Sequence, residues 1–157
     1  MQIVIGIVVV GIIVAVVASA MKNKKKNKKN RESAENQYKG SELQITKIVR
    51  EYMGVNVPVI IVRSPDQKIP HFANKVWDEV EHSHGKLAKA FYLDGRVYVK
   101  KWVRGEPTKE ISNEIYFKLL VHEFNHALGM DHGEHMTSAD SALINEIRPI
   151  LVNQGLI

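Results

Sequence analysis

Three histidines, a glutamate and a glycine stand at fixed offsets in the stretch HEFNHALGMDH near the C-terminal end of the chain. His122 and His126 are four residues apart, so on a helix they lie about one turn apart on the same face. This geometry allows both imidazoles to bind one Zn²⁺ at ~2.0–2.1 Å. Glu123 is turned about 100° around the helix from these histidines. From there it can reach a water on the metal and act as a general base, so the pattern indicates a hydrolytic zinc site.

The residues after this predicted helix supply candidates for a third ligand. Gly129 can take a positive φ at little cost and turn the chain sharply. His132 can then return to the metal, and three histidine ligands would leave the fourth position to water. His135 could close the site instead, and Asp131 could be a ligand or a partner of one. The spacing from the glycine favours His132.

The stretch HEFNHALGMDH resembles the zinc-binding signature of the metzincin metallopeptidases. It is most similar to the matrixin branch, whose signature often continues with Asp-His, as Asp131 and His132 do here. The resemblance is tight over these eleven residues and loose elsewhere. It implies that His122, His126 and His132 bind Zn²⁺, that Glu123 is the general base, and that the substrate is a peptide or protein.

The same resemblance implies a methionine turn beneath the metal, for which Met136 is the candidate. An ordinary core methionine is the alternative. Met136 follows His132 by only four residues, and the usual Met-Tyr-Pro-type continuation is absent. The family also binds extended peptides along an edge strand, a known recognition mode. The chain has no cysteine, which excludes disulfides, a thiol nucleophile and a thiolate zinc site.

The first residues predict a membrane anchor over 1–21. The run from Ile3 to Ala20 is apolar except for Ser19. Its length is close to the ~20 residues that a helix needs to cross a bilayer. Ala18-Ser19-Ala20 resembles a signal-peptidase site, so cleavage near Ala20 and a secreted or periplasmic domain is the alternative. Met1-Gln2 offers no basic n-region, and this favours an uncleaved single-pass anchor.

A basic linker is predicted over 22–40, with six lysines and one arginine between Lys22 and Arg31. The net charge of +5 leaves −2 for the rest of the chain once these seven charges are subtracted. The basic residues directly follow the anchor, which favours contact with anionic lipid and a cytoplasmic domain rather than nucleic-acid binding.

The remaining residues, 41–157, predict one small α+β domain with a zincin-like arrangement: a mixed sheet with an edge hairpin, an active-site helix and a C-terminal helix. A helix is expected from Ser41 to Gly54, a strand over 55–62 and a short helix over 74–81. Asp94-Gly95 predicts a tight hairpin, whose Lys100-Lys101 pair would protect a sheet edge. A long helix is expected from Pro107 to Gly129, and a last helix over 138–153 that Ser138 or Asp140 caps.

Two functions follow from these expectations. The first is a membrane-anchored zinc endopeptidase. The second is a non-catalytic, membrane-tethered scaffold or peptide-binding domain stabilised by zinc. The scaffold would have a closed fourth zinc position, filled by His135 or Asp131. A glutamate next to the ligand row favours the enzyme, because a purely structural site has no use for a general base.

Overall fold

The computed structural model describes residues 40–157, apart from positions 70, 73 and 85–88. The predicted anchor (1–21) and the basic linker up to residue 39 lie outside the described residues. In the described part, no helix is both long enough and apolar enough to span a bilayer. The described part is a small α+β domain with four helices and two small sheets, as the sequence predicts at this coarse level.

A three-stranded mixed sheet forms the centre of the fold. It contains β1 (Val59–Val62), β2 (Ala90–Leu93) and β3 (Arg96–Lys100) in the order β1-β3-β2. β1 runs parallel to β3, and β2 runs antiparallel to it. Asp94 and Gly95 have φ values of 48° and 70°, as the predicted two-residue turn requires. The hairpin is therefore confirmed, and β2 lies at an edge of the sheet.

The two faces of this sheet carry separate apolar clusters, because successive side chains on a strand point to opposite faces. Val59, Ile61, Val97 and Val99 face a cluster shared with helices. Ile60, Val62 and Tyr98 face a second cluster, which is rich in aromatic rings and includes Trp77 and Trp102. The rings of Phe91 and Tyr98 stack there with centroids 4.9 Å apart. Both tryptophans are thus core residues.

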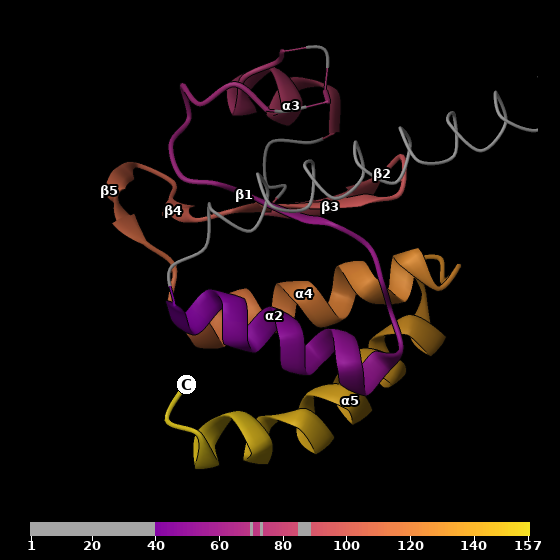
Figure 1. The fold of residues 1–157 in the computed structure, drawn as a ribbon. Helices are drawn as coiled ribbons and strands as arrows, with labels where there is room; N and C mark the ends of the chain where they lie inside the picture. Colours follow the sequence, from indigo (N-terminus) through magenta and orange to yellow (C-terminus); the bar gives the residue numbers. More distant parts are fainter. Residues whose placement is uncertain (1–39, 70, 73, 85–88) are drawn as a thin grey trace, which may run out of the picture. The chain divides into compact units, whose positions relative to one another are not determined.

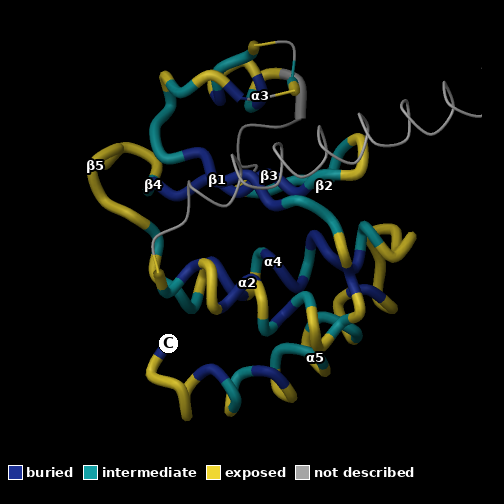
Figure 2. Tube along the Cα trace, in the orientation of Figure 1, coloured by how far each residue is buried: buried dark blue, intermediate teal, exposed yellow. Residues whose placement is uncertain are grey.

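Helices cover both faces of the sheet (Figure 1). α3 (Trp77–His84) lies over the aromatic cluster. α2 (Gly40–Met53) and α4 (Asn113–Ala127) lie on the opposite side, with α5 (Glu134–Asn153) beyond them. α4 contacts β2, β3, α2 and α5. Figure 2 shows buried stretches along α4, so the helix that carries His122 and His126 is packed on several sides.

Several predicted element boundaries are wrong. The strand expected over 55–62 begins only at Val59, directly after Pro58, which has no N–H to donate. The helix expected over 74–81 begins at Trp77, and the last helix begins at Glu134 rather than Ser138. Asp140 consequently lies inside α5 and caps nothing.

The helix expected from Pro107 is also wrong at its beginning. β4 (Trp102–Val103) and β5 (Glu106–Glu110) instead form a two-stranded antiparallel sheet. α4 begins at Asn113, where the side chain of Ser112 accepts a hydrogen bond from the N–H of Ile115. A serine cap satisfies a helix N–H that has no partner in the helix, so it competes successfully with the Pro-Thr start.

Lys100 and Lys101 do not protect an exposed edge, because β3 is the central strand. Both side chains are buried and paired with carboxylates. The Lys101 Nζ lies 2.9 Å from an oxygen of Glu42, and the Lys100 Nζ lies 2.7 Å from an oxygen of Glu81. Removing one partner would leave an uncompensated buried charge, so these pairs constrain how α2 and α3 pack.

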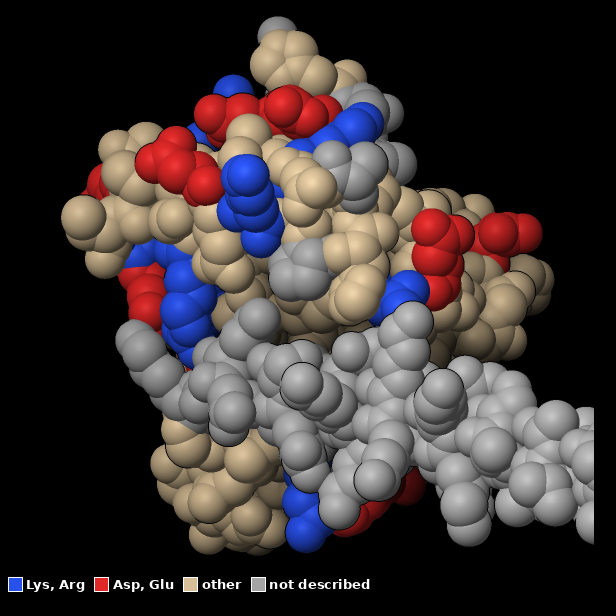
Figure 3. Space-filling model, turned by 45° about the horizontal axis from the view of Figure 1, so that its top comes forward, with Lys and Arg blue, Asp and Glu red and all other residues tan. Residues whose placement is uncertain are grey.

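Charges of both signs are interspersed on the face drawn in Figure 3. Among the described residues visible there, lysine and arginine side chains alternate with aspartate and glutamate rather than gathering into one basic patch. This agrees with the sequence arithmetic, which assigns the positive excess to residues 22–31.

Candidate metal centre

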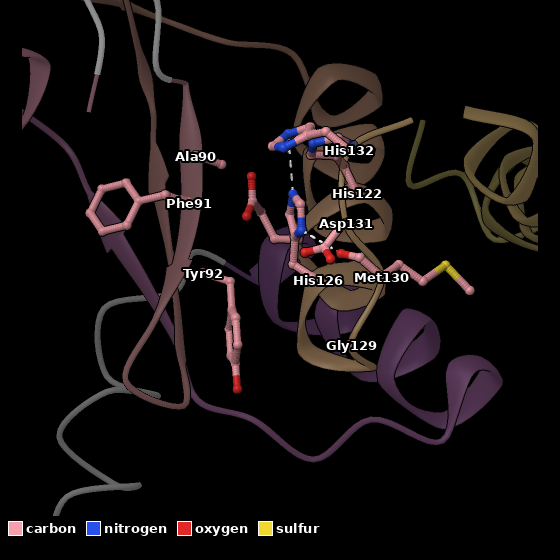
Figure 4. Close-up of a pocket in the computed structure, with 10 residues that line it drawn as sticks. Ala90, Phe91, Tyr92, His122, His126, Gly129, Met130, Asp131 and His132 are labelled. Atoms are coloured by element: carbon pink, nitrogen blue, oxygen red, sulfur yellow. Dashed lines mark hydrogen bonds between the residues drawn. The ribbon is translucent and has the colours of Figure 1, made fainter. Parts of the chain in front are cut away.

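α4 presents His122 and His126 towards the same space, as their spacing of four residues predicts. Their ring centroids are 5.0 Å apart. Figure 4 shows both rings on the side of α4 that faces strand β2. Both side chains are partly exposed, which leaves them accessible from the cavity in front of the helix.

The chain reverses after α4 and brings His132 back to these two histidines. Gly129 has a φ of 88°, and no atom within 4 Å would meet a Cβ there. The requirement for glycine therefore comes from the left-handed backbone conformation and not from crowding. After this turn, the His132 Nε2 lies 3.3 Å from the His126 Nε2. The sequence prediction of a sharp glycine turn followed by a returning histidine is confirmed.

The three imidazoles offer ligand atoms that all lie within 4.8 Å of one another. Three donors this close can hold one metal ion. Among the described residues, neither His135 nor Asp131 belongs to this group. His135 is exposed, while Asp131 lines the cavity beside the histidines. The geometry thus favours His132 as the third ligand.

Hydrogen bonds donated by Nδ1 orient two of the rings. The Nδ1 of His126 lies 2.8 Å from the carbonyl oxygen of Met130 and donates to it. The Nδ1 of His122 lies 2.7 Å from a carboxylate oxygen of Asp140 on α5. A ring that donates from Nδ1 keeps the lone pair of its Nε2 free for a metal. The donor set therefore fits a metal ion bound through Nε2.

Glu123 lies next to this row but is buried, with only 4 % of its surface exposed. Burial raises its pKa from 4.5 to about 7, while His122 and a hydrogen bond from the backbone of Tyr92 act in the opposite direction. Its Oε2 is buried without a hydrogen-bond partner among the described residues. A buried oxygen without a partner is costly, so this atom is suited to bind a water or substrate group in the cavity.

A cavity of about 520 Å³ lies between β2 and the histidines. Its wall consists of residues from β2, α4 and the turn after α4: Ala90, Phe91, Tyr92, His122, Glu123, His126, Gly129, Met130, Asp131 and His132. Figure 4 shows the Phe91 side chain turned away from the three histidines and the Ala90 side chain turned towards them. The edge strand is therefore one wall of the candidate site.

Met136, the expected methionine-turn residue, is the third residue of α5 and not part of a separate turn. Its side chain is 2 % exposed, and it does not line the cavity. This position matches the alternative of an ordinary buried methionine. The helix begins earlier than the sequence predicts, so residues 134–137 are helical.

Sequence reasoning missed three residues of this site: Asn125, Asp140 and Tyr92. Asn125 is fully buried, and its Nδ2 donates to Asp140 across 2.6 Å. The sequence pointed to Asn125 in one way only: metzincins often have a small residue at this position of the motif. Asp140 comes from α5 and Tyr92 from β2, so local spacing could not connect either of them to the histidines.

Neither a scan against protein-family models nor searches of curated proteins and of solved structures finds a match to this chain.

Proposed function

We propose that this protein is a zinc-dependent endopeptidase of the metzincin type, tethered to a membrane by residues 1–21. The observation that carries the proposal is the convergence of His122, His126 and His132, with the buried Glu123 beside them. Three neutral imidazoles and no thiolate are a donor set that suits zinc. A site with three protein ligands leaves room for a reactant, as catalytic zinc sites do.

Glu123 has the properties of a general base. A bound zinc ion would polarise the substrate carbonyl and acidify water. Glu123 would accept a proton from that water through its carboxylate and pass it to the amine of the leaving group. A base works best when its pKa lies near the working pH, and burial brings the pKa of Glu123 to about 7. Its unpaired Oε2 is the atom available for the water.

Within the described residues, β2 has a strand on one side only, and its other side suits an extended peptide. The N–H of Lys100 donates to the carbonyl of Lys89, which identifies the residues of β2 that bond to β3. Bonding along an antiparallel strand alternates, so Ala90 and Tyr92 turn their backbone groups away from β3. The N–H of Tyr92 already bonds to Glu123, so a peptide would pair with the other backbone groups on this side. A peptide pairing with this edge would lie across the cavity, with its scissile bond near Glu123.

The proposal is tested with the full-length chain in detergent, as wild type and as Glu123→Gln. Loss of the base should lower cleavage of a fluorescence-quenched peptide library by about 100-fold or more. Zinc measured by mass spectrometry should remain near one ion per chain, because glutamine leaves the three histidines in place. Unchanged hydrolysis by Glu123→Gln would contradict its role as the base.

The same preparation separates the enzyme from the scaffold alternative. His132→Ala should release zinc, whereas the matched variant His135→Ala should retain it, because only His132 lies in the metal group. Zinc binding by wild type without cleavage of any library peptide would favour the scaffold. Zinc retained by His132→Ala would contradict the three-histidine site.

A further inference from the structure

A carboxylate from the last helix connects two residues of the active-site helix. Asp140 on α5 accepts a hydrogen bond from the Nδ1 of His122 through Oδ2 and from the Nδ2 of Asn125 through Oδ1. Both bonds are short, at 2.7 and 2.6 Å. Asn125 is fully buried, and the Asp140 side chain is 17 % exposed. The arrangement is thus sheltered from solvent, which strengthens each hydrogen bond.

The two ligands on α4 are oriented by different means. The ring of His126 is held by the carbonyl of Met130, four residues later in the same turn. The ring of His122 depends on a side chain eighteen residues later on a separate helix. α4 can therefore orient His126 through its own C-terminal turn, but it cannot orient His122 without α5.

Asn125 holds the carboxylate of Asp140 in place. With Oδ1 and Oδ2 each engaged, the carboxylate can rotate only by breaking a hydrogen bond. Its negative charge also makes the imidazole of His122 a stronger donor to a cation. Both effects act on the metal through His122, and neither residue lies in the metal group itself.

We infer that Asp140 and Asn125 are positioning residues that set the zinc affinity by fixing the orientation of the His122 ring. α5, which supplies Asp140, therefore contributes to the metal centre. This inference rests on the proposed zinc site. It implies an order of dependence: Asn125 acts on Asp140, and Asp140 acts on His122. Loss of such outer partners typically lowers metal affinity 10- to 100-fold.

The test compares Asp140→Ala, Asn125→Ala and the double variant in the full-length chain, with Glu146→Ala as the matched control. Glu146 is also a carboxylate on α5, and it accepts a hydrogen bond from Tyr52 on α2, away from the site. Zinc affinity is measured by competition with a chromophoric chelator. The visible spectrum of the cobalt-substituted protein reports the geometry of the ligands, and thermal unfolding of the metal-free protein reports folding.

Asp140→Ala should weaken zinc binding about 10- to 100-fold and change the cobalt spectrum. Asn125→Ala should weaken it less, and the double variant should lose no more affinity than Asp140→Ala, because Asn125 acts through Asp140. Glu146→Ala should bind zinc as wild type does, even if its metal-free melting temperature falls.

Three results would overturn the inference alone. The first two are a wild-type zinc affinity in Asp140→Ala, and affinity losses in the two single variants that simply add. An equal loss of affinity in Glu146→Ala would assign the effect to α5 stability and also overturn it. Absence of zinc binding by the wild-type protein would overturn the proposed function, and the inference with it.

Discussion

Burial affects Glu123 and the three histidines in different ways. The histidines are half-buried or exposed, and hydrogen-bond partners orient His122 and His126. Glu123, in contrast, is buried with one oxygen unpaired among the described residues. In the metal-free protein, the charged form of Glu123 is penalised by desolvation, and this is the largest reason for its raised pKa. The residue that we propose as the general base is therefore one that the metal-free fold holds at a cost.

This cost predicts a pH dependence of stability. The pKa of Glu123 is about 7 in the folded state, against 4.5 for an unperturbed glutamate. Between these values the folded state holds a proton that the unfolded state releases, so the free energy of unfolding falls as pH rises from about 4.5 to 7. A shift of this size corresponds to roughly 3 kcal/mol.

Urea unfolding of metal-free wild type and Glu123→Gln at several pH values measures this contribution. The variant should be close to wild type below pH ~4.5 and more stable above pH ~7. Parallel stability curves over the whole range would contradict the burial of a charged Glu123.

At the scale of elements, the end of α4 determines whether His132 reaches His122 and His126. The N–H of Gly129 donates to the carbonyl of His126, and the N–H of Met130 donates to the carbonyl of Asn125. These bonds close the helix and redirect the chain. The left-handed Gly129 is thus both a helix terminator and the residue that aims His132.

Gly129→Ala should destabilise the protein by about 1 kcal/mol and also weaken zinc binding, because relief of the strained φ displaces His132. Gly54→Ala is the matched control. Gly54 ends α2 with a φ of 66° and, like Gly129, has no atom near a potential Cβ. Chelator competition and urea unfolding should show similar stability losses in both variants and an affinity loss only in Gly129→Ala. Equal zinc affinities of Gly129→Ala and Gly54→Ala would mean that the turn at Gly129 does not position His132.

At the scale of the whole molecule, the sheet separates two cores with different consequences for the site. The cluster beneath the sheet joins β2 and β3 to α2, α4 and α5, and therefore holds Glu123 against the edge strand. The aromatic cluster on the other face joins the sheet to α3. Damage to the first core should change the distance between α4 and β2, whereas damage to the second should not.

Val121→Ala and Val80→Ala test this difference with one chemical change. Both valines are fully buried: Val121 lies in the core shared with α2, α4 and α5, and Val80 belongs to α3 and lies in the aromatic cluster. Each substitution should cost about 2 kcal/mol in urea unfolding. Peptide hydrolysis, measured where both variants are folded, should fall several-fold only for Val121→Ala, because small misplacements of reacting groups are costly. Equal rate losses would contradict the separation.

Local patterns in the sequence were enough for the hairpin at Asp94-Gly95, the three histidines and the glycine turn. Each of these depends on residues within a few positions of one another, where helix and turn geometry leave few choices. The beginning of α4 could not be predicted as well, because a Pro-Thr start and a serine cap five residues later are both locally acceptable.

Only the tertiary structure decided which distant residues complete the site. The partner of His122 is Asp140, which local rules assigned to a helix cap, and the wall facing Glu123 is the edge strand β2. The buried ion pairs that Lys100 and Lys101 form with glutamates could not be predicted from the sequence either. They depend on β3 being the central strand. Contacts between elements far apart in the chain arise from packing of whole layers, and no short sequence window contains that information.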